Sequence, residues 1–155
     1  MFLAACHPSQ DASPTTSDLD PTTTSEPGTV SARLVLDSMT MSAGSTMNAH
    51  LIVENSTGAD IHVDGCLSLF QLALSSEAYE PTVAWAACRQ PLTVPEGEST
   101  HPLRVIARYS SCGGSGRPCA SDGGTPPLPP GDYQANLYQV GEIVPPPPAI
   151  TVRVT

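Results

Sequence analysis

The alternation of side chains between His101 and Tyr109 constrains the fold of this chain more than any other feature of its sequence. One set of alternate residues is mostly apolar or aromatic and consists of His101, Leu103, Val105, Ala107 and Tyr109. Arg104 and Arg108 belong to the opposite set. Because successive side chains of a β-strand point to opposite faces, this pattern predicts a strand with one face in a core and the other in water. Half-buried antiparallel sheets show this alternation.

The same period of two recurs along most of the chain from Val30 onward. Met47, Ala49, Leu51 and Val53 are expected on one face of a strand, with His50 on the other. We expect strands at residues 33–36, 47–55, 60–63, 67–75, 81–87, 101–109, 133–139 and 150–154. The segment at 67–75 is expected to lie in the centre of a sheet, and residues 73–79 allow a short helix as an alternative.

Short runs of glycine, serine, asparagine and proline separate these segments and predict turns. They lie at residues 42–45, 55–58 and 95–98. Gly58 is suited to a positive φ angle, because glycine has no Cβ. Residues 145–148 are all proline, which cannot donate to a strand ladder, so they are expected to connect the last two strands.

The five cysteines divide into Cys6 and four in the body of the chain. Four cysteines allow three pairings, and closure of local loops favours Cys66 with Cys88 and Cys112 with Cys119. The chain-entropy model gives these bonds about 3 and 2.5 kcal/mol. A zinc site needs closer pairs, so we expect no metal and no cofactor. Disulfides persist in oxidising compartments, which predicts a protein outside the cytoplasm.

The residues Leu3-Ala4-Ala5-Cys6 resemble the lipobox that ends the signal peptide of bacterial lipoproteins. The resemblance implies that residues 1–6 are the remnant of a signal peptide and that Cys6 carries a diacylglyceryl group. The protein would then be anchored on the extracytoplasmic face of the cell membrane. A secretory signal also needs a charged start and an apolar run of roughly 7–15 residues, and only Met1 and Phe2 precede the box. A chance match at a cytosolic start is the alternative.

Residues 7–29 differ sharply in composition from the rest of the chain. They contain four acidic residues, no basic residue and one large apolar side chain, Leu19. Such a segment cannot bury enough surface to offset its chain entropy, which predicts a disordered linker. The folded domain is therefore expected at residues 30–155, held away from the membrane by this linker.

Pro130-Gly131-Asp132-Tyr133, followed by strands at 133–139 and 150–154, resembles the end of bacterial immunoglobulin-like sandwich domains. The resemblance implies an all-β antiparallel sandwich of about seven to nine strands, in which Tyr133 closes a corner through its hydroxyl. It does not extend to the antibody disulfide, because Ala135 stands where a cysteine would follow the tyrosine. The whole chain also resembles actinobacterial lipoproteins with such a domain, which implies a compartment but no activity.

Charge and motifs exclude several classes of function. The formal charge is -9, and the six arginines are scattered singly, so no basic patch exists for nucleic acid or for an anionic membrane surface. The chain has no H-E-x-x-H, G-x-S-x-G or phosphate-loop motif, and we expect no catalytic residue. His50 and His62 would face each other across a tight hairpin at 55–58 and offer a metal or pH-sensing pair, but ordinary surface histidines are favoured.

Residues 110–130 form the best candidate binding loop, because rigid sandwiches present their variable chemistry on loops. Its only charged side chains are Arg117 and Asp122. We therefore expect a non-catalytic envelope protein that binds an unidentified protein partner. One alternative is a protease inhibitor that presents Arg117 on the loop closed by Cys112 and Cys119. Others are an enzyme whose site no linear motif reveals, and an accessory domain of an envelope complex.

Overall fold

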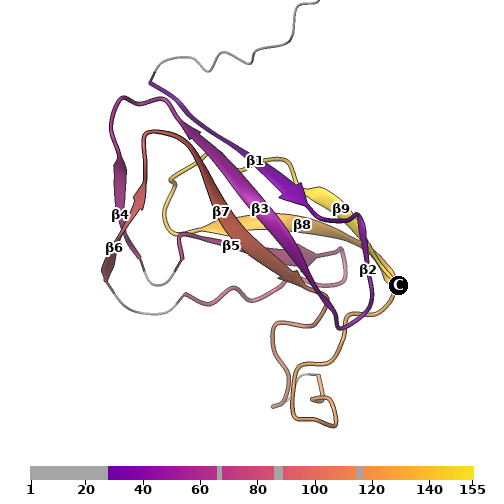
Figure 1. Ribbon diagram of the computed structural model, residues 1–155. Coiled ribbons are helices and arrows are strands. Elements are labelled where there is room, and N and C mark those ends of the chain that lie inside the picture. The colour runs from indigo at the N-terminus through magenta and orange to yellow at the C-terminus, as the bar shows by residue number, and fades with distance from the viewer. Residues whose placement is uncertain (1–27, 66–67, 86–88, 115–116) are drawn as a thin grey trace, which may run out of the picture.

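The computed structural model describes residues 28–65, 68–85, 89–114 and 117–155, and these residues form an all-β structure without a helix (Figure 1). Cys6, Cys66 and Cys88 lie outside the described residues. The strands are β1 (Val30–Leu36), β2 (Thr40–Met41), β3 (Thr46–Asn55), β4 (Ile61–Gly65), β5 (Phe70–Ser75), β6 (Gln90–Val94), β7 (Gly97–Ile106), β8 (Gly131–Gln139) and β9 (Ile150–Val154). None of the described residues forms a helix long and apolar enough to cross a membrane.

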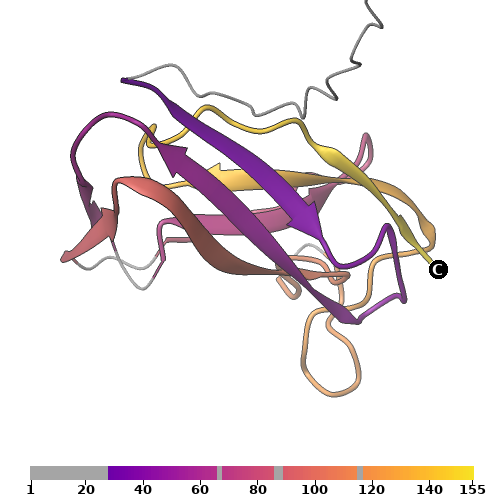
Figure 2. The ribbon, with the colours of Figure 1, turned by 45° about the horizontal axis from the view of Figure 1, so that its top comes forward.

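The strands form two larger sheets and one small one. The first sheet has the order β1-β3-β7, the second has the order β2-β9-β8-β5, and β4 pairs with β6. All pairings are antiparallel except that of β2 with β9, which is parallel. The two larger sheets lie face to face, as in a β-sandwich (Figures 1 and 2).

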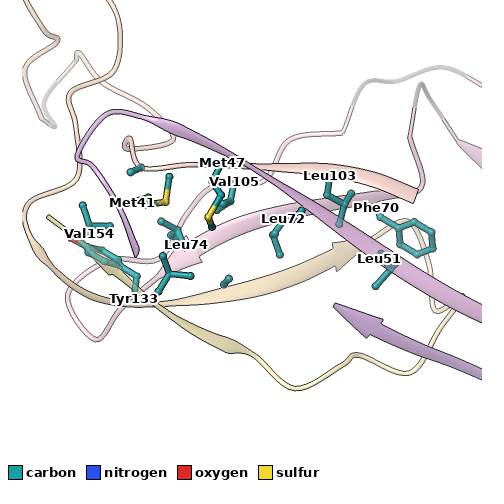
Figure 3. Packing of buried hydrophobic residues seen from close by; sticks show 14 of the residues in the cluster. Met41, Met47, Leu51, Phe70, Leu72, Leu74, Leu103, Val105, Tyr133 and Val154 are labelled. Atoms are coloured by element: carbon teal, nitrogen blue, oxygen red, sulfur yellow. The ribbon is translucent and has the colours of Figure 1, made fainter. Parts of the chain in front are cut away.

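The core lies between these two sheets and takes alternate side chains from each strand (Figure 3). In β3 the buried residues are Met47, Ala49, Leu51 and Val53, as the alternation predicts. In β7, Leu103 and Val105 are buried, whereas Arg104 is exposed. The second sheet contributes Phe70, Leu72, Leu74, Tyr133, Val152 and Val154. Each fully buried aliphatic side chain contributes roughly 1.5–3 kcal/mol of transfer free energy.

One side of the sandwich is closed by a strand that changes sheets. β1 pairs with β3 in the first sheet, and a few residues later β2 pairs with β9 in the second. The predicted turn at 42–45 is present, with Gly44 at φ 77° and the Ser45 amide 3.0 Å from the Ser42 carbonyl oxygen. It joins β2 to β3, whereas we expected it to follow the first strand directly.

The opposite side of the sandwich departs from three expectations. β5 is an edge strand and not a central one, since it pairs only with β8. The alternative helix at 73–79 is absent, because β5 continues to Ser75 and a tight turn follows with hydrogen bonds between Ser76 and Tyr79. Residues 81–85 of the expected strand at 81–87 form no strand. Side chains hold this segment, since Gln71 donates to the Ala84 carbonyl oxygen over 3.1 Å.

The small sheet removes the alternative in which His50 and His62 face each other. β4 does not fold back on β3, and His62 in β4 lies opposite Thr93 of β6. His50 lies between Val35 and Pro102 in the first sheet. That alternative required a tight hairpin after Asn55, which is not formed. β6 was also not predicted, because its period of two is interrupted by Pro91.

Asn55 explains why the chain turns away from β3. Its side chain is fully buried, and its amide nitrogen donates to the carbonyl oxygens of Ala59, Val94 and Pro95 at 2.9, 3.3 and 3.2 Å. Its oxygen accepts hydrogen bonds from the backbone and hydroxyl of Thr57. Asn55 thus ties the end of β3 to the end of β6.

Candidate binding site

The loop between β7 and β8 is closed by a disulfide between Cys112 and Cys119, as predicted, with a Cα to Cα distance of 4.9 Å. The predictions for Cys66, Cys88 and Cys6 concern residues outside those described. Asp122 is exposed, and its carboxylate accepts a hydrogen bond from the Gly124 amide over 2.9 Å. Asp122 therefore stabilises a local turn of the loop.

The second half of the loop is bound firmly to the sandwich. Arg108, which we expected in water, is half-buried, and its guanidinium group donates to the carbonyl oxygens of Gly44 and Thr125 at 3.1 and 2.7 Å. The Leu128 amide donates to Ala107, and the Leu128 side chain is only 1% exposed. These bonds fix the returning chain against the end of β7.

Two tyrosines that the sequence did not single out hold the first half of the loop. The rings of Tyr79 and Tyr109 meet edge to face with centroids 4.9 Å apart, and the Tyr79 hydroxyl accepts a hydrogen bond from the Ser110 amide over 2.8 Å. The guanidinium carbon of Arg117 lies 3.2 Å from the centroid of the Tyr109 ring. This cation–π contact places Arg117 against the sandwich.

A groove of about 510 Å³ lies beside this stack, between the edges of β5 and β7. Its apolar lining includes Tyr79, Val83 and Ile106, and Ile106 is 49% exposed. The charged side chains that line it are Arg104 and Arg108. The groove is therefore lined by both apolar and polar groups and is positively charged, although the chain as a whole carries a formal charge of -9.

A second hollow of about 360 Å³ continues the groove toward the disulfide loop. Both hollows are lined by Tyr79, Thr82 and Ser110, and the second also reaches Glu80 and Arg117. The structure thus brings Arg117 to the end of the groove. Asp122 lines neither hollow.

The titratable side chains elsewhere do not assemble into a reactive or metal-binding site within the described residues. No group of three His, Cys, Asp or Glu residues there is suited to hold a metal ion. His101 packs edge to face on Phe70 with ring centroids 5.0 Å apart, and its Nε2 atom lies 3.1 Å from the Ser99 hydroxyl. Burial lowers the pKa of His101 below its usual 6.5. His101 therefore serves as a rim residue of the core, as its position in the alternation predicts.

The motif at the start of β8 is held by its own contacts. The Tyr133 hydroxyl donates to the Pro129 carbonyl oxygen over 2.9 Å, and burial raises the pKa of Tyr133. Asp132 pairs with Arg153 of β9 at 2.8 Å on the solvent face. The hydrogen bond from Arg153 lowers the pKa of Asp132. These residues stabilise the strand ends, and none of them lines the groove or the second hollow.

No protein-family model matches the chain, and no curated protein is significantly similar to it. The function must therefore be argued from the groove and the loop.

Proposed function

We propose that this chain is a non-catalytic, lipid-anchored envelope protein whose immunoglobulin-like β-sandwich binds a protein partner through the groove and the disulfide loop. The observation that carries the proposal is the fixed position of the loop. The Cys112–Cys119 bond, the Arg108 hydrogen bonds and the packing of Arg117 on Tyr109 hold it beside the groove. A surface ordered before binding loses less conformational entropy when a partner docks.

The order of the strands supports the immunoglobulin-like assignment. Immunoglobulin domains place their first, second, fourth and fifth strands in one sheet and the third, sixth and seventh in the other. The sheets β1-β3-β7 and β5-β8-β9 match this division except for the fourth strand, because β6 pairs with β4 and not with β7. The hydrogen bond from Tyr133 to Pro129 is the corner that the resemblance implies.

Two features support anchoring outside the cytoplasm. The Leu3-Ala4-Ala5-Cys6 sequence supplies the acceptor cysteine, and a disulfide such as Cys112–Cys119 is typical of oxidising compartments. The non-catalytic part of the proposal rests on the groove, whose described lining contains no Asp, Glu, His or Cys. These residues supply most general bases and nucleophiles, and the hydroxyl groups present have no such partner in the groove. In the second hollow, Glu80 accepts a hydrogen bond from Tyr138 and Cys112 is held in the disulfide.

Two measurements on protein expressed from its native locus test the proposal. Intact mass spectrometry should give a chain that begins at Cys6 and carries a diacylglyceryl group. A photoreactive amino acid in place of Ser121, which is exposed on the loop, should cross-link one envelope protein, whereas the same replacement at Ser31 on β1 should not. An unmodified Cys6, or identical cross-linking at both positions, would contradict the proposal.

Protease inhibition is the second candidate, because the disulfide-closed loop that it requires is present. Arg117 packs on Tyr109, however, so it would have to leave that ring to enter a protease cleft. Assays of trypsin-like proteases with an excess of the full chain distinguish the two functions. Full residual protease activity would remove this candidate, and lasting inhibition that is lost in Arg117→Ala would establish it.

A further inference from the structure

We propose that the groove receives an extended acidic peptide segment of the partner, which adds as a strand to the free edge of β7. This inference rests on the proposed binding function and names the class of partner. Strand addition is a common mode of peptide recognition at exposed sheet edges.

Pro102 shows which backbone groups of β7 face the free edge. Pro102 lies opposite His50 in the ladder with β3, and proline has no N–H to donate. Its backbone therefore points away from β3, and so do those of Arg104 and Ile106 at the next alternate positions. Ala107 belongs to the other set of alternate residues, whose backbone groups point toward β3. Its amide donates to the carbonyl oxygen of Ser45, the residue directly before β3.

The two sides of the sandwich differ in how the sheets are joined. On one side β1 and β2 lie at the ends of their sheets, and the chain between them passes directly from one sheet to the other. On the opposite side β5 and β7 lie at the ends of their sheets (Figure 2). Residues 81–85 pass beside the groove there without pairing with either strand. An incoming strand thus finds unpaired backbone groups along β7 among the described residues.

Charge indicates an acidic occupant. Of the arginines near the groove, Arg108 is engaged by carbonyl oxygens. Arg104 is exposed, and Asp132 with Arg153 form the only ion pair among the described residues. Asp37 shares a hollow with Arg104, and Glu80 shares one with Arg117. The described lining of the groove itself includes Arg104 and Arg108 but no carboxylate, so the groove attracts an acidic peptide and disfavours a basic one.

The pleat of β7 predicts the pattern of the peptide. Arg104 and Ile106 point to the outer face of the first sheet, whereas Leu103 and Val105 point inward. A strand added to β7 continues this alternation, so every second side chain would lie beside Arg104 and the others would enter the groove near Tyr79 and Val83. The expected ligand alternates acidic and apolar residues.

The test uses a fluorescein-labelled peptide of alternating aspartate and valine, roughly nine residues long, the length of a long strand. Fluorescence anisotropy should show binding to the full chain that weakens with added salt. A peptide of alternating lysine and valine should not bind. Equal binding of the two peptides would overturn the proposal.

Variants locate the site on β7. Arg104→Glu should raise the dissociation constant of the aspartate peptide by roughly tenfold. Arg33→Glu is the matched control, because Arg33 is exposed on the same sheet face at the other edge, and it should leave affinity unchanged. N-methylation of alternate peptide amides tests strand addition. The methyl groups can be placed on the odd or on the even residues of the peptide, and only one of these two sets of amides would point toward β7. Methylation of that set should abolish binding, and methylation of the other set should not. Equal effects of both would overturn the proposal.

The remaining outcomes separate this inference from the proposed function. If the peptide does not bind while the Ser121 cross-link still forms, the inference fails and the proposed function stands. If neither occurs, both fail. A dimer in sedimentation velocity that Arg104→Glu dissociates would assign the edge to a second copy of this chain and overturn the peptide proposal.

Discussion

Arg117 lies on the face of the Tyr109 ring, with its guanidinium carbon 3.2 Å from the ring centroid. The sequence marked Arg117 as the only cation of its loop, but it gave no reason to expect that the cation is held in place. Tyr109 is itself positioned by its edge-to-face contact with Tyr79. The loop, the end of β7 and the turn after β5 therefore form one packed unit.

Replacement of both Cys112 and Cys119 by serine should lower the free energy of unfolding by about 2.5 kcal/mol, because the unfolded chain gains loop entropy. Urea denaturation of the oxidised wild type and the double variant measures this. The variant should also bind the aspartate peptide more weakly, since Arg117 loses its position. Unchanged stability with unchanged binding would show that the other loop contacts suffice.

Tyr133→Phe should lower the free energy of unfolding by about 1 kcal/mol, because the hydrogen bond to Pro129 is lost while the ring stays buried. The control is Tyr138→Phe. The Tyr138 hydroxyl also donates a hydrogen bond, over 3.1 Å to Glu80, but that contact is exposed to water. Removal of the Tyr138 hydrogen bond should therefore lower the free energy of unfolding by less than removal of the Tyr133 hydrogen bond. An equal or greater destabilisation by Tyr138→Phe would contradict the assigned role of Tyr133.

Strands with an uninterrupted period of two could be predicted from sequence. The alternation at 101–109 and at 47–55 is local, and it identified the buried residues of β3 and β7 correctly. β7, however, begins at Gly97, inside the turn expected at 95–98, and ends at Ile106, before the half-buried Arg108. Residues 81–85 and β6 were misjudged because proline and the neighbouring strands decide whether such short segments pair. The position of β5 at an edge depends on β8, far along the chain, so no local pattern reveals it.

The candidate site was predictable only in part. The cysteine spacing indicated the Cys112–Cys119 loop, and that disulfide is present. Tyr79 and Tyr109 were not predicted as partners of the loop, since they come from separate segments that only the packed sheets bring together. Tyr109, the last residue of the alternation at 101–109, stands beside a loop with one arginine, and this was the available signal.

Asn55→Ala should lower the free energy of unfolding by roughly 2–3 kcal/mol, because the buried carbonyl oxygen of Val94 and those of Ala59 and Pro95 lose their donor. Asn48→Ala is the matched control, since Asn48 is exposed on the same strand. Chemical denaturation of both variants measures the difference. Equal effects would show that Asn55 does not secure the junction of β3 and β6.

The stability of the fold should decrease as the pH falls through the range in which His101 takes up a proton. Burial lowers the pKa of His101 in the folded state below 6.5, so the unfolded chain binds this proton first. The contribution of neutral His101 to the free energy of unfolding is therefore complete above pH 6.5, the ordinary histidine pKa. This contribution is lost as the pH falls toward the pKa of His101 in the folded state. His101→Gln removes the titration while keeping a polar group beside Ser99. Urea denaturation from about pH 7.5 to about pH 5.5 should show a smaller decrease in the free energy of unfolding for this variant than for the wild type. An identical decrease in both proteins would assign the pH dependence to other groups.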